Sequence, residues 1–302
     1  MWLIDTATLQ LKFFPNAEGL KYAILSHTWG PEEISFQEMA TRETITTSGK
    51  LGWSKIGLTC KLALETYGLK YAWIDTCCID KTSSADLSEA INSMFAWYQS
   101  ATVCLAYLED FTLTSRGSWD NAVLQEGLKS CKWFTRGWTL QELIAPSDVS
   151  FYDGNWTRIG TKKALTGMLS AITHIDENVL HDVGFLPLVH VGKKMSWAAS
   201  RKTTRIEDMA YCLLGIFDIQ MPLLYGEGKK AFLRLQEQIA RSVNDLTLFA
   251  WEQDASLKNG ADRRGLFALT PCEFKNCNRL QVLEHPLEQE IEFTFTNRGL
   301  RI

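Results

Sequence analysis

Glu142 is the only acidic residue in the stretch 133-WFTRGWTLQELIAP-146, where Arg136 and Trp138 precede it by six and four positions. A single carboxylate among apolar, aromatic and basic residues has two interpretations. It is either an ion-pair partner for Arg136 or the working group of a site. An arginine near the start of a helix opposes the helix dipole, so Arg136 needs an anionic ligand or a carboxylate such as Glu142 or Asp110 beside it.

A second group of reactive side chains follows two apolar segments. Ser26, His27 and Trp29 end the segment YAILSHTW (22–29), and Asp75 lies within YAWIDTCCID (71–80). His27 has a structural interpretation, in which it ties a loop to the sheet, and a functional one, in which it binds a ligand or orients Glu142. Asp75 either caps a turn, binds a ligand or fixes His27.

A hydrolase triad of Ser26, His27 and Asp75 is disfavoured. Neighbouring residues of a strand point to opposite faces of the sheet, and the sequence lacks the G-x-S-x-G turn of α/β-hydrolases. Cys77 and Cys78 are expected to pack in the interior rather than to act as nucleophiles. The five histidines show no metal-ligand spacing, so no metal site is expected.

Alternating strands and helices must position these residues. Four apolar segments predict strands, at 22–29, 71–80, 102–110 and 149–156, and the segments between and after them predict helices, at 54–68, 85–100, 133–145 and 161–174. This alternation predicts an α/β fold with a parallel sheet flanked by helices. Ligands of such sheets bind at the carboxyl ends of the strands, where we expect the reactive residues to meet.

The second half of the chain is predicted to be helical before it turns to short strands. Within 195–217, Thr204 and Glu207 have the spacing of a capping box that opens an apolar helix ending near Gly215, and 229–243 has the apolar stripe of an amphipathic helix. The segments LTLFAWEQ, GLFALTPCEF and EIEFTFTNRG resemble strands. The chain stops within the last pattern, so we expect it to be a piece of a longer protein.

The composition argues against several classes of function. The 302 residues carry a net charge of −4 with mixed signs, so no nucleic-acid partner is expected. No apolar run approaches the roughly 20 residues that span a bilayer, and the N-terminus lacks a secretion signal. Eight cysteines without a C-x-x-C pair indicate reduced thiols. We therefore expect a soluble, cytoplasmic protein without a membrane span.

Several long motifs, in order, resemble the HET domain of fungal heterokaryon-incompatibility proteins. They are YAILSHTWG, YAWIDTCCIDKTSSADLSEAINSMFAWYQSA, WFTRGWTLQELIAP and YDGNW, followed by RKTTRIEDMAYCLLGIFDIQMPLLYGEGKKAFLRLQEQI. The resemblance covers roughly residues 20–250. It implies a trigger of regulated cell death when incompatible fungal cells fuse. Such domains are often attached to a nucleotide-binding module of the STAND or NACHT type, which we expect further along the full-length protein.

The HET domain is in turn similar to the TIR domain. The chain gives ILSH where a TIR domain has a strand with a serine, and WIDTCCIDKTSS where it has an acidic strand end and a loop. Trp138 precedes Glu142 as a tryptophan precedes the TIR glutamate. This similarity implies a TIR-like, flavodoxin-like sheet and cleavage of the nicotinamide–ribose bond of NAD⁺. The insertion 31–52 and the His27–Trp29 box depart from the TIR pattern.

The resemblance implies the following site. Glu142 is the catalytic residue and stabilises the oxocarbenium-like ribose. The expected NAD⁺-binding residues are Ser26, His27, Trp29, Asp75, Arg136 and Trp138. NAD⁺ is a substrate, so no cofactor is expected. Self-association is expected to complete the pocket. The alternative is a non-enzymatic adaptor that self-associates and recruits death machinery.

The expected organisation has three parts. Residues 1–175 form the HET domain, 176–250 a helical extension packed on it, and 251–302 the β-rich start of a downstream region.

Overall fold

A computed structural model describes the chain at residues 1–16, 18–41, 49–113, 121–253, 265–280, 293–296 and 299–301. The chain divides into two compact units, Met1–Gly184 and Phe185–Ile302. The three-part organisation expected from the sequence remains a prediction.

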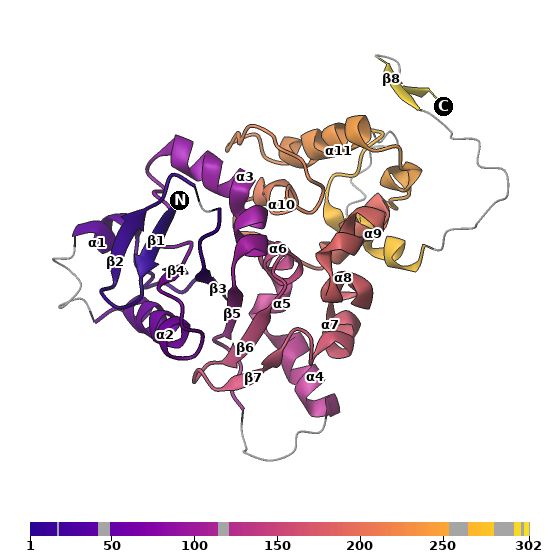
Figure 1. Cartoon of the computed structure of the whole chain (residues 1–302). Coiled ribbons are helices and arrows are strands. Elements are labelled where there is room, and N and C mark those ends of the chain that lie inside the picture. Colours follow the sequence, from indigo (N-terminus) through magenta and orange to yellow (C-terminus); the bar gives the residue numbers. More distant parts are fainter. Residues whose placement is uncertain are drawn as a thin grey trace. The chain divides into compact units, whose positions relative to one another are not determined.

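The first unit is built on a seven-stranded sheet with the order β2-β1-β4-β3-β5-β6-β7 (Figure 1). Its strands are β1 (Trp2–Asp5), β2 (Gln10–Phe13), β3 (Tyr22–His27), β4 (Tyr71–Trp73), β5 (Val103–Leu108), β6 (Val149–Asp153) and β7 (Arg158–Thr161). The four central strands are parallel, whereas β1, β2 and β7 join antiparallel at the edges. Taken in chain order, the parallel strands are arranged 2-1-3-4, as in flavodoxin-like sheets. The predicted α/β class is confirmed.

The two middle strands of the parallel part, β3 and β5, are covered by helices on both faces, and their sequences are correspondingly apolar. β3 reads YAILSH and β5 reads VCLAYL, and every residue of both strands is buried. Continuous apolar runs of this kind are typical of buried parallel strands. Ser26 pairs with Ala106 and His27 with Tyr107, so the carboxyl ends of β3 and β5 lie side by side.

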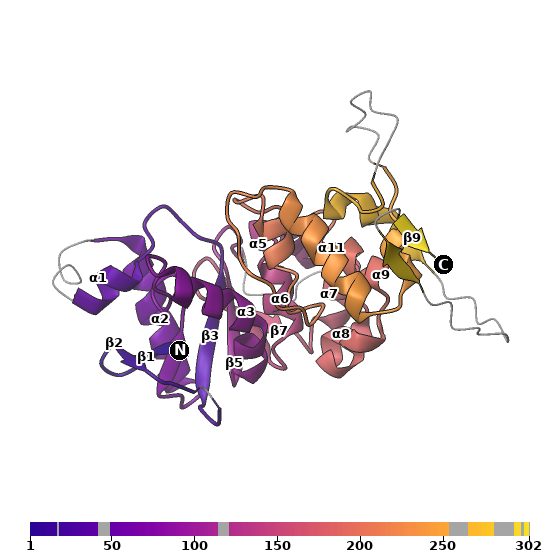
Figure 2. The same cartoon turned by 90° about the horizontal axis from the view of Figure 1, so that it is seen from above.

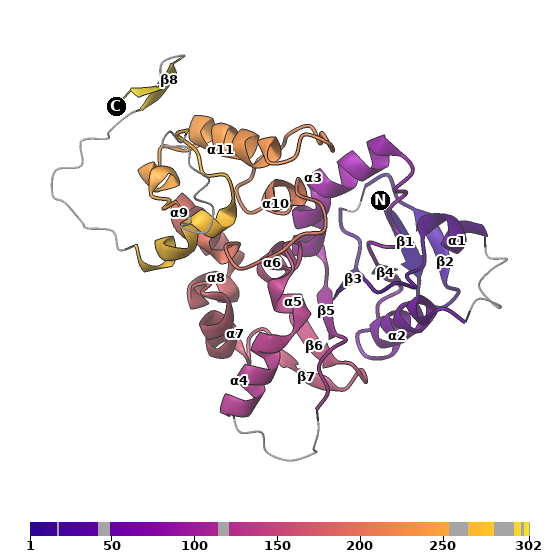
Figure 3. The ribbon, with the colours of Figure 1, turned by 180° about the vertical axis from the view of Figure 1, so that it is seen from behind.

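Helices on the two faces come from different connections. α2 (Leu51–Glu65) contacts β3 and β4, and α6 (Thr139–Ile144) contacts β3 and α3 (Ser84–Ser100). Figures 1 and 3 show α2 on the opposite side of the sheet from α6 and α5 (Lys132–Thr135). The remaining helices of this unit are α1 (Phe36–Thr41), α4 (Asn121–Ser130), α7 (Thr166–Thr173) and α8 (Glu177–His181).

Two predicted elements of this unit are corrected. The strand expected over 71–80 ends at Trp73, because the carbonyl of Ile74 accepts hydrogen bonds from the backbone N–H groups of Cys77 and Cys78 and closes a turn. The helix expected over 133–145 is broken at Arg136, whose backbone is extended. The hydroxyl of Thr139 donates to the carbonyls of Trp133 and Arg136 and stabilises the break.

The second unit is mainly helical in its described residues. Its elements, with the one that crosses the boundary, are η1 (Val183–Leu188), α9 (Val191–Trp197), α10 (Asp208–Tyr211), α11 (Lys230–Ser242), η2 (Leu246–Phe249), η4 (Pro271–Arg279), β8 (Thr294–Thr296) and β9 (Gly299–Arg301). α11 (Figure 2) matches the amphipathic helix predicted over 229–243. The strands predicted for LTLFAWEQ and GLFALTPCEF are wrong, since 246–249 and 271–279 form 3-10 helices.

Glu207 does not act as the capping-box partner that its spacing predicts. Its Oε1 accepts hydrogen bonds from the backbone N–H groups of Gly226 and Gly228, at 2.8 and 3.0 Å. Both glycines have positive φ angles, which residues with a side chain rarely adopt. The YGEG turn therefore wraps around a carboxylate of the chain itself.

None of the helices in the described residues has the length and apolar character that a membrane crossing requires.

Candidate functional site

Glu142 lies beside the carboxyl end of β3. α6 brings its carboxyl group to Ser26, whose hydroxyl donates a hydrogen bond to Oε2. The indole N–H of Trp133 donates to the same hydroxyl oxygen at 2.8 Å. Glu142 is only 6% exposed. The three side chains thus connect α5, β3 and α6 in one buried polar chain.

The environment of Glu142 changes its acidity. Burial raises the pKa of this carboxyl group to about 8, and the charge of Asp75 acts in the same direction. The hydrogen bond from Ser26 and the charge of Arg136 oppose the increase in pKa. A carboxyl group with this pKa exchanges its proton near neutral pH, as acid–base groups of active sites do, and buried structural networks shift pKa values as well.

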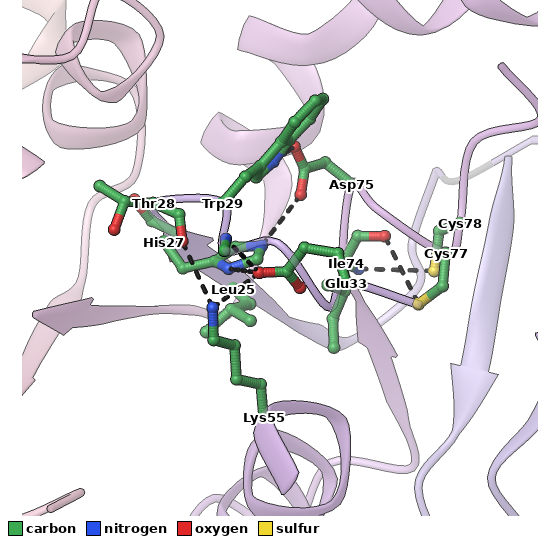
Figure 4. A network of polar contacts seen from close by, with 12 residues as sticks. Leu25, His27, Thr28, Trp29, Glu33, Lys55, Ile74, Asp75, Cys77 and Cys78 are labelled. Carbon is green, nitrogen blue, oxygen red and sulfur yellow. Dashed lines mark hydrogen bonds and ion pairs between the residues drawn. The ribbon is translucent and has the colours of Figure 1, made fainter. Parts of the chain in front are cut away.

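His27 follows Ser26 in β3, so its side chain points to the opposite face of the sheet. Figure 4 shows its contacts. Its Nε2 lies 3.1 Å from Oδ1 of Asp75, and the indole N–H of Trp29 donates to Oδ2 of Asp75 at 2.8 Å. One carboxylate therefore fixes two aromatic side chains of the SHTW segment. Burial opposes ionisation of Asp75, but the hydrogen bond and charge of His27 outweigh it and lower the pKa of Asp75 to about 2. Ser26 and His27 consequently serve different partners.

An ion-pair network extends from His27 to α2 (Figure 4). Nζ of Lys55 lies 2.6 Å from Oε1 of Glu33 and 3.5 Å from Oε2 of Glu109. The same Glu33 oxygen lies 3.7 Å from Nδ1 of His27. The Lys55 ammonium also donates to the carbonyl of Thr28 at 3.4 Å. This network connects the ends of β3 and β5 to α2.

The sequence prediction missed Glu33 and Lys55, although the position of Lys55 in the helical pattern could have indicated its burial. It recurs at helical spacing with Gly52, Ile56 and Thr59, which are all buried on α2. A lysine on the inward face of an amphipathic helix needs a buried partner. Glu33 lies in the 31–52 insertion and has no comparable periodicity.

Trp29 and Arg136 meet at the surface. Trp29 is 47% exposed, and the guanidinium carbon of Arg136 lies 5.7 Å from the centre of its indole ring. The ammonium of Lys81, which the sequence prediction also missed, lies closer, at 3.8 Å. Both distances are within the range of cation–π interactions.

Trp138 immediately precedes α6 as its N-cap and is half-buried. Its carbonyl accepts the N–H of Glu142 at 3.5 Å, so one helical turn separates the two residues, as their spacing predicts. The stacking of its indole on a ligand remains a prediction.

Three buried polar atoms at or beside the predicted site residues lack a hydrogen-bond partner among the described residues. They are Nδ1 of His27, Oγ1 of Thr76 and Nε2 of Gln141. Thr76 adjoins Asp75, and Gln141 adjoins Glu142. Buried polar groups rarely lack partners, so these atoms are candidates for binding a polar ligand.

The cysteines have the properties of interior thiols. All eight are free, and seven are buried. The hydrogen bond with Cys78 and burial raise the pKa of Cys77 well above its ordinary value, which disfavours a thiolate nucleophile. Within the described ranges, no cluster of three or more His, Cys, Asp or Glu side chains is arranged to hold a metal ion.

Comparison with known families identifies the class of the chain. Residues 22–126 match the family described as Heterokaryon incompatibility protein (HET), and residues 230–302 match the Domain of unknown function (DUF8212). The first match contains β3, β4 and β5 with Ser26, His27, Trp29 and Asp75, and it ends before Glu142. The chain is a HET-domain protein, which confirms the resemblance seen in its motifs.

A curated relative extends this likeness. The chain is 45% identical over 233 residues to the vegetative incompatibility protein HET-E-1 of Podospora anserina. The match covers 76% of the chain but only 17% of that much longer protein. No solved structure matches the chain. The likeness to TIR domains therefore remains a prediction.

Proposed function

We propose that the chain is the effector part of a fungal heterokaryon-incompatibility protein and that it kills cells by hydrolysing the nicotinamide–ribose bond of NAD⁺. The HET match and the similarity to HET-E-1 support the role in incompatibility. The observation that carries the enzymatic part is the buried carboxyl group of Glu142, with a pKa of about 8, at the carboxyl end of β3.

The position of Glu142 beside the carboxyl end of β3 supports this proposal. In a 2-1-3-4 sheet, the connections from the first and third parallel strands leave on opposite faces, and ligands bind at the carboxyl ends of those two strands. Here these strands are β3 and β5, and Ser26 and Ala106 pair near their carboxyl ends. Ser26 holds Glu142 at this point, and His27, the next residue of β3, engages Asp75.

The proposed reaction breaks the bond between the ribose carbon and the nicotinamide nitrogen. The bonding electron pair leaves with nicotinamide, which becomes neutral, and the ribose acquires oxocarbenium character. Glu142 stabilises this positive charge in its ionised form, which it reaches by releasing a proton with a pKa of about 8. Water then attacks the ribose carbon and loses a proton, which gives ADP-ribose. Ser26 has the role of fixing one oxygen of the carboxyl group in place.

A second candidate function is supported by the burial of Glu142. A residue that is 6% exposed and already hydrogen-bonded fits a structural role, because the protein itself covers the carboxyl group. In that case the chain is a non-enzymatic adaptor that self-associates and recruits death machinery. In the enzymatic proposal, self-association opens or completes the substrate site.

A downstream signalling module belongs to the same proposal. The chain spans 17% of the length of the relative that it matches, which leaves room for further domains in a full-length protein. We propose a nucleotide-binding STAND or NACHT-type module there, whose assembly clusters the HET domain.

Forced clustering separates the two functions. The chain is fused to a tetramerising helix, and nicotinamide release from NAD⁺ is measured at equal chain concentration for the fused and unfused forms. The enzymatic proposal predicts release that increases several-fold on clustering. A folded, clustered protein without detectable release favours the adaptor.

A further inference from the structure

Trp29 has the properties of a platform for a flat ligand. Its indole is 47% exposed, yet its N–H is held by Oδ2 of Asp75 at 2.8 Å. The other oxygen of that carboxylate is engaged by His27 at 3.1 Å. The ring is therefore exposed and fixed at once. Fixed, exposed aromatic rings are the usual surfaces on which nucleic-acid bases stack.

Lys81 covers this platform with an exchangeable cation. Its ammonium lies 3.8 Å from the centre of the Trp29 ring, and its side chain is exposed. The cation–π attraction of an exposed lysine is weak, whereas its attraction to a phosphate is stronger because the phosphate carries formal charge. An arriving phosphate is therefore able to draw the ammonium off the ring.

The backbone that carries Lys81 is fixed, so only its side chain needs to move. Oδ1 of Asp80 accepts hydrogen bonds from the side chain of Gln37 at 2.6 Å and from the backbone N–H of Thr82 at 2.9 Å. Directly afterwards, Ser83 caps α3 by accepting from the N–H of Asp86. Lys81 thus extends from an anchored turn between β4 and α3.

We propose that Lys81 and Trp29 form the subsite for an adenine nucleotide, in which Lys81 binds a phosphate and the uncovered indole stacks on the base. Arg136, whose guanidinium carbon is 5.7 Å from the same ring, adds a second positive charge. The negative charge of Asp75 is engaged by His27 and Trp29. The identification of the ligand as part of NAD⁺ depends on the proposed function, whereas the subsite itself depends only on this geometry.

Calorimetry with ADP and adenosine tests the subsite. We expect Lys81→Met to weaken ADP binding about ten-fold, as for the loss of one charge-assisted contact, and to leave adenosine binding unchanged or slightly tighter. Lys81→Arg is expected to keep most of the affinity for ADP. Increasing salt is expected to weaken ADP binding more in the unmodified protein than in Lys81→Met.

Lys70→Met provides a matched control. Lys70 is also exposed and also lies over an aromatic ring, 5.7 Å from the centre of Tyr71, but it precedes β4 at the amino end of the strand. It is expected to leave ADP binding unchanged. Equal weakening of ADP binding by Lys70→Met and Lys81→Met contradicts the subsite, because it indicates a general effect of net charge.

The outcomes distinguish this inference from the proposed function. ADP binding that depends on Lys81, without nicotinamide release from NAD⁺ by the clustered chain, supports the subsite and removes the enzymatic proposal. Nicotinamide release with the same KM in Lys81→Met, together with unchanged ADP affinity, overturns the subsite and keeps the enzyme. An unmodified protein that binds neither ADP nor adenosine also overturns the subsite.

Discussion

The hydroxyl of Ser26 donates a hydrogen bond to the carboxyl group of Glu142, which is 116 positions further along the chain. The same oxygen accepts the indole N–H of Trp133 at 2.8 Å. The position of Glu142 therefore depends on the end of β3 as well as on α6.

Ser26→Ala is expected to destabilise the protein by roughly 1–3 kcal/mol, because it leaves the buried Trp133 N–H and the Glu142 carboxyl group without their shared partner. Urea unfolding at pH 7 measures this change in the free energy of unfolding. Thr166→Val is the control, since the buried Thr166 hydroxyl donates to carbonyls of the preceding turn. Equal stability of Ser26→Ala and the unmodified protein contradicts the proposed contribution of the hydrogen bond.

Glu142 is expected to make stability decrease as the pH rises. Its pKa is about 8 in the folded protein and near 4.5 when unperturbed, so between these values the folded state holds a proton that the unfolded chain has released. The stabilisation is complete below pH 4.5 and is lost as the pH rises to 8, with a slope of up to about 1.4 kcal/mol per pH unit. Glu142→Gln removes this dependence.

Unfolding curves recorded from pH 5 to 8 test this expectation. The free energy of unfolding of Glu142→Gln, relative to that of the unmodified protein, is predicted to increase steadily as the pH rises from 5 to 8. A constant difference between the two proteins indicates instead that Glu142 titrates near its ordinary value.

Asp75 has the opposite pH dependence. Its pKa is lowered from 3.8 to about 2, so it stabilises the folded state above pH 4, and this stabilisation is lost as the pH falls towards 2. Asp75→Asn is expected to lower the free energy of unfolding by on the order of 2 kcal/mol at pH 7. The stability of this variant is expected to change less between pH 4 and 2 than that of the unmodified protein. Acid unfolding followed by circular dichroism measures both. A variant with the same acid midpoint as the unmodified protein contradicts the assignment.

Lys162 is expected to hold the end of α6. Its ammonium donates to the carbonyls of Leu143 and Ile144, at 3.2 and 3.4 Å, and to that of Pro146. Burial lowers the pKa of Lys162 to about 8. Lys162→Met leaves these carbonyls without their donor and is expected to destabilise the protein by about 1–3 kcal/mol. The neighbouring Lys163→Met is the control, and equal urea midpoints for the two variants would argue against this role.

The sequence predicts the interior of the sheet better than its edges. β3, β5 and β6 lie within segments predicted as strands, because strands buried on both faces appear as apolar runs. β2 and β7 are short and partly exposed, so their sequences lack such a run. The break at Arg136 depends on hydrogen bonds from Thr139, which no local pattern reveals.

The candidate site is predictable only in part. The order of motifs drew attention to Ser26, His27, Asp75 and Glu142, but the partner of each depends on strand pairing and on which face of the sheet it occupies. The link between Lys55 and Glu33 joins α2 to a loop, and Lys81 is an exposed lysine like many others. Only the three-dimensional arrangement distinguishes Lys81 from Lys70.

Nicotinamide release from NAD⁺ by the clustered chain and by its Glu142→Gln variant tests the central claim most directly. The substitution keeps the size of the side chain and its capacity to accept the Ser26 hydrogen bond, so the fold is retained and can be verified by circular dichroism. The account predicts release by the unmodified chain and at least a hundred-fold loss in the variant, the order expected when an electrostatic stabiliser of the transition state is removed. Equal release by both proteins, or none from the folded and clustered unmodified chain, contradicts it.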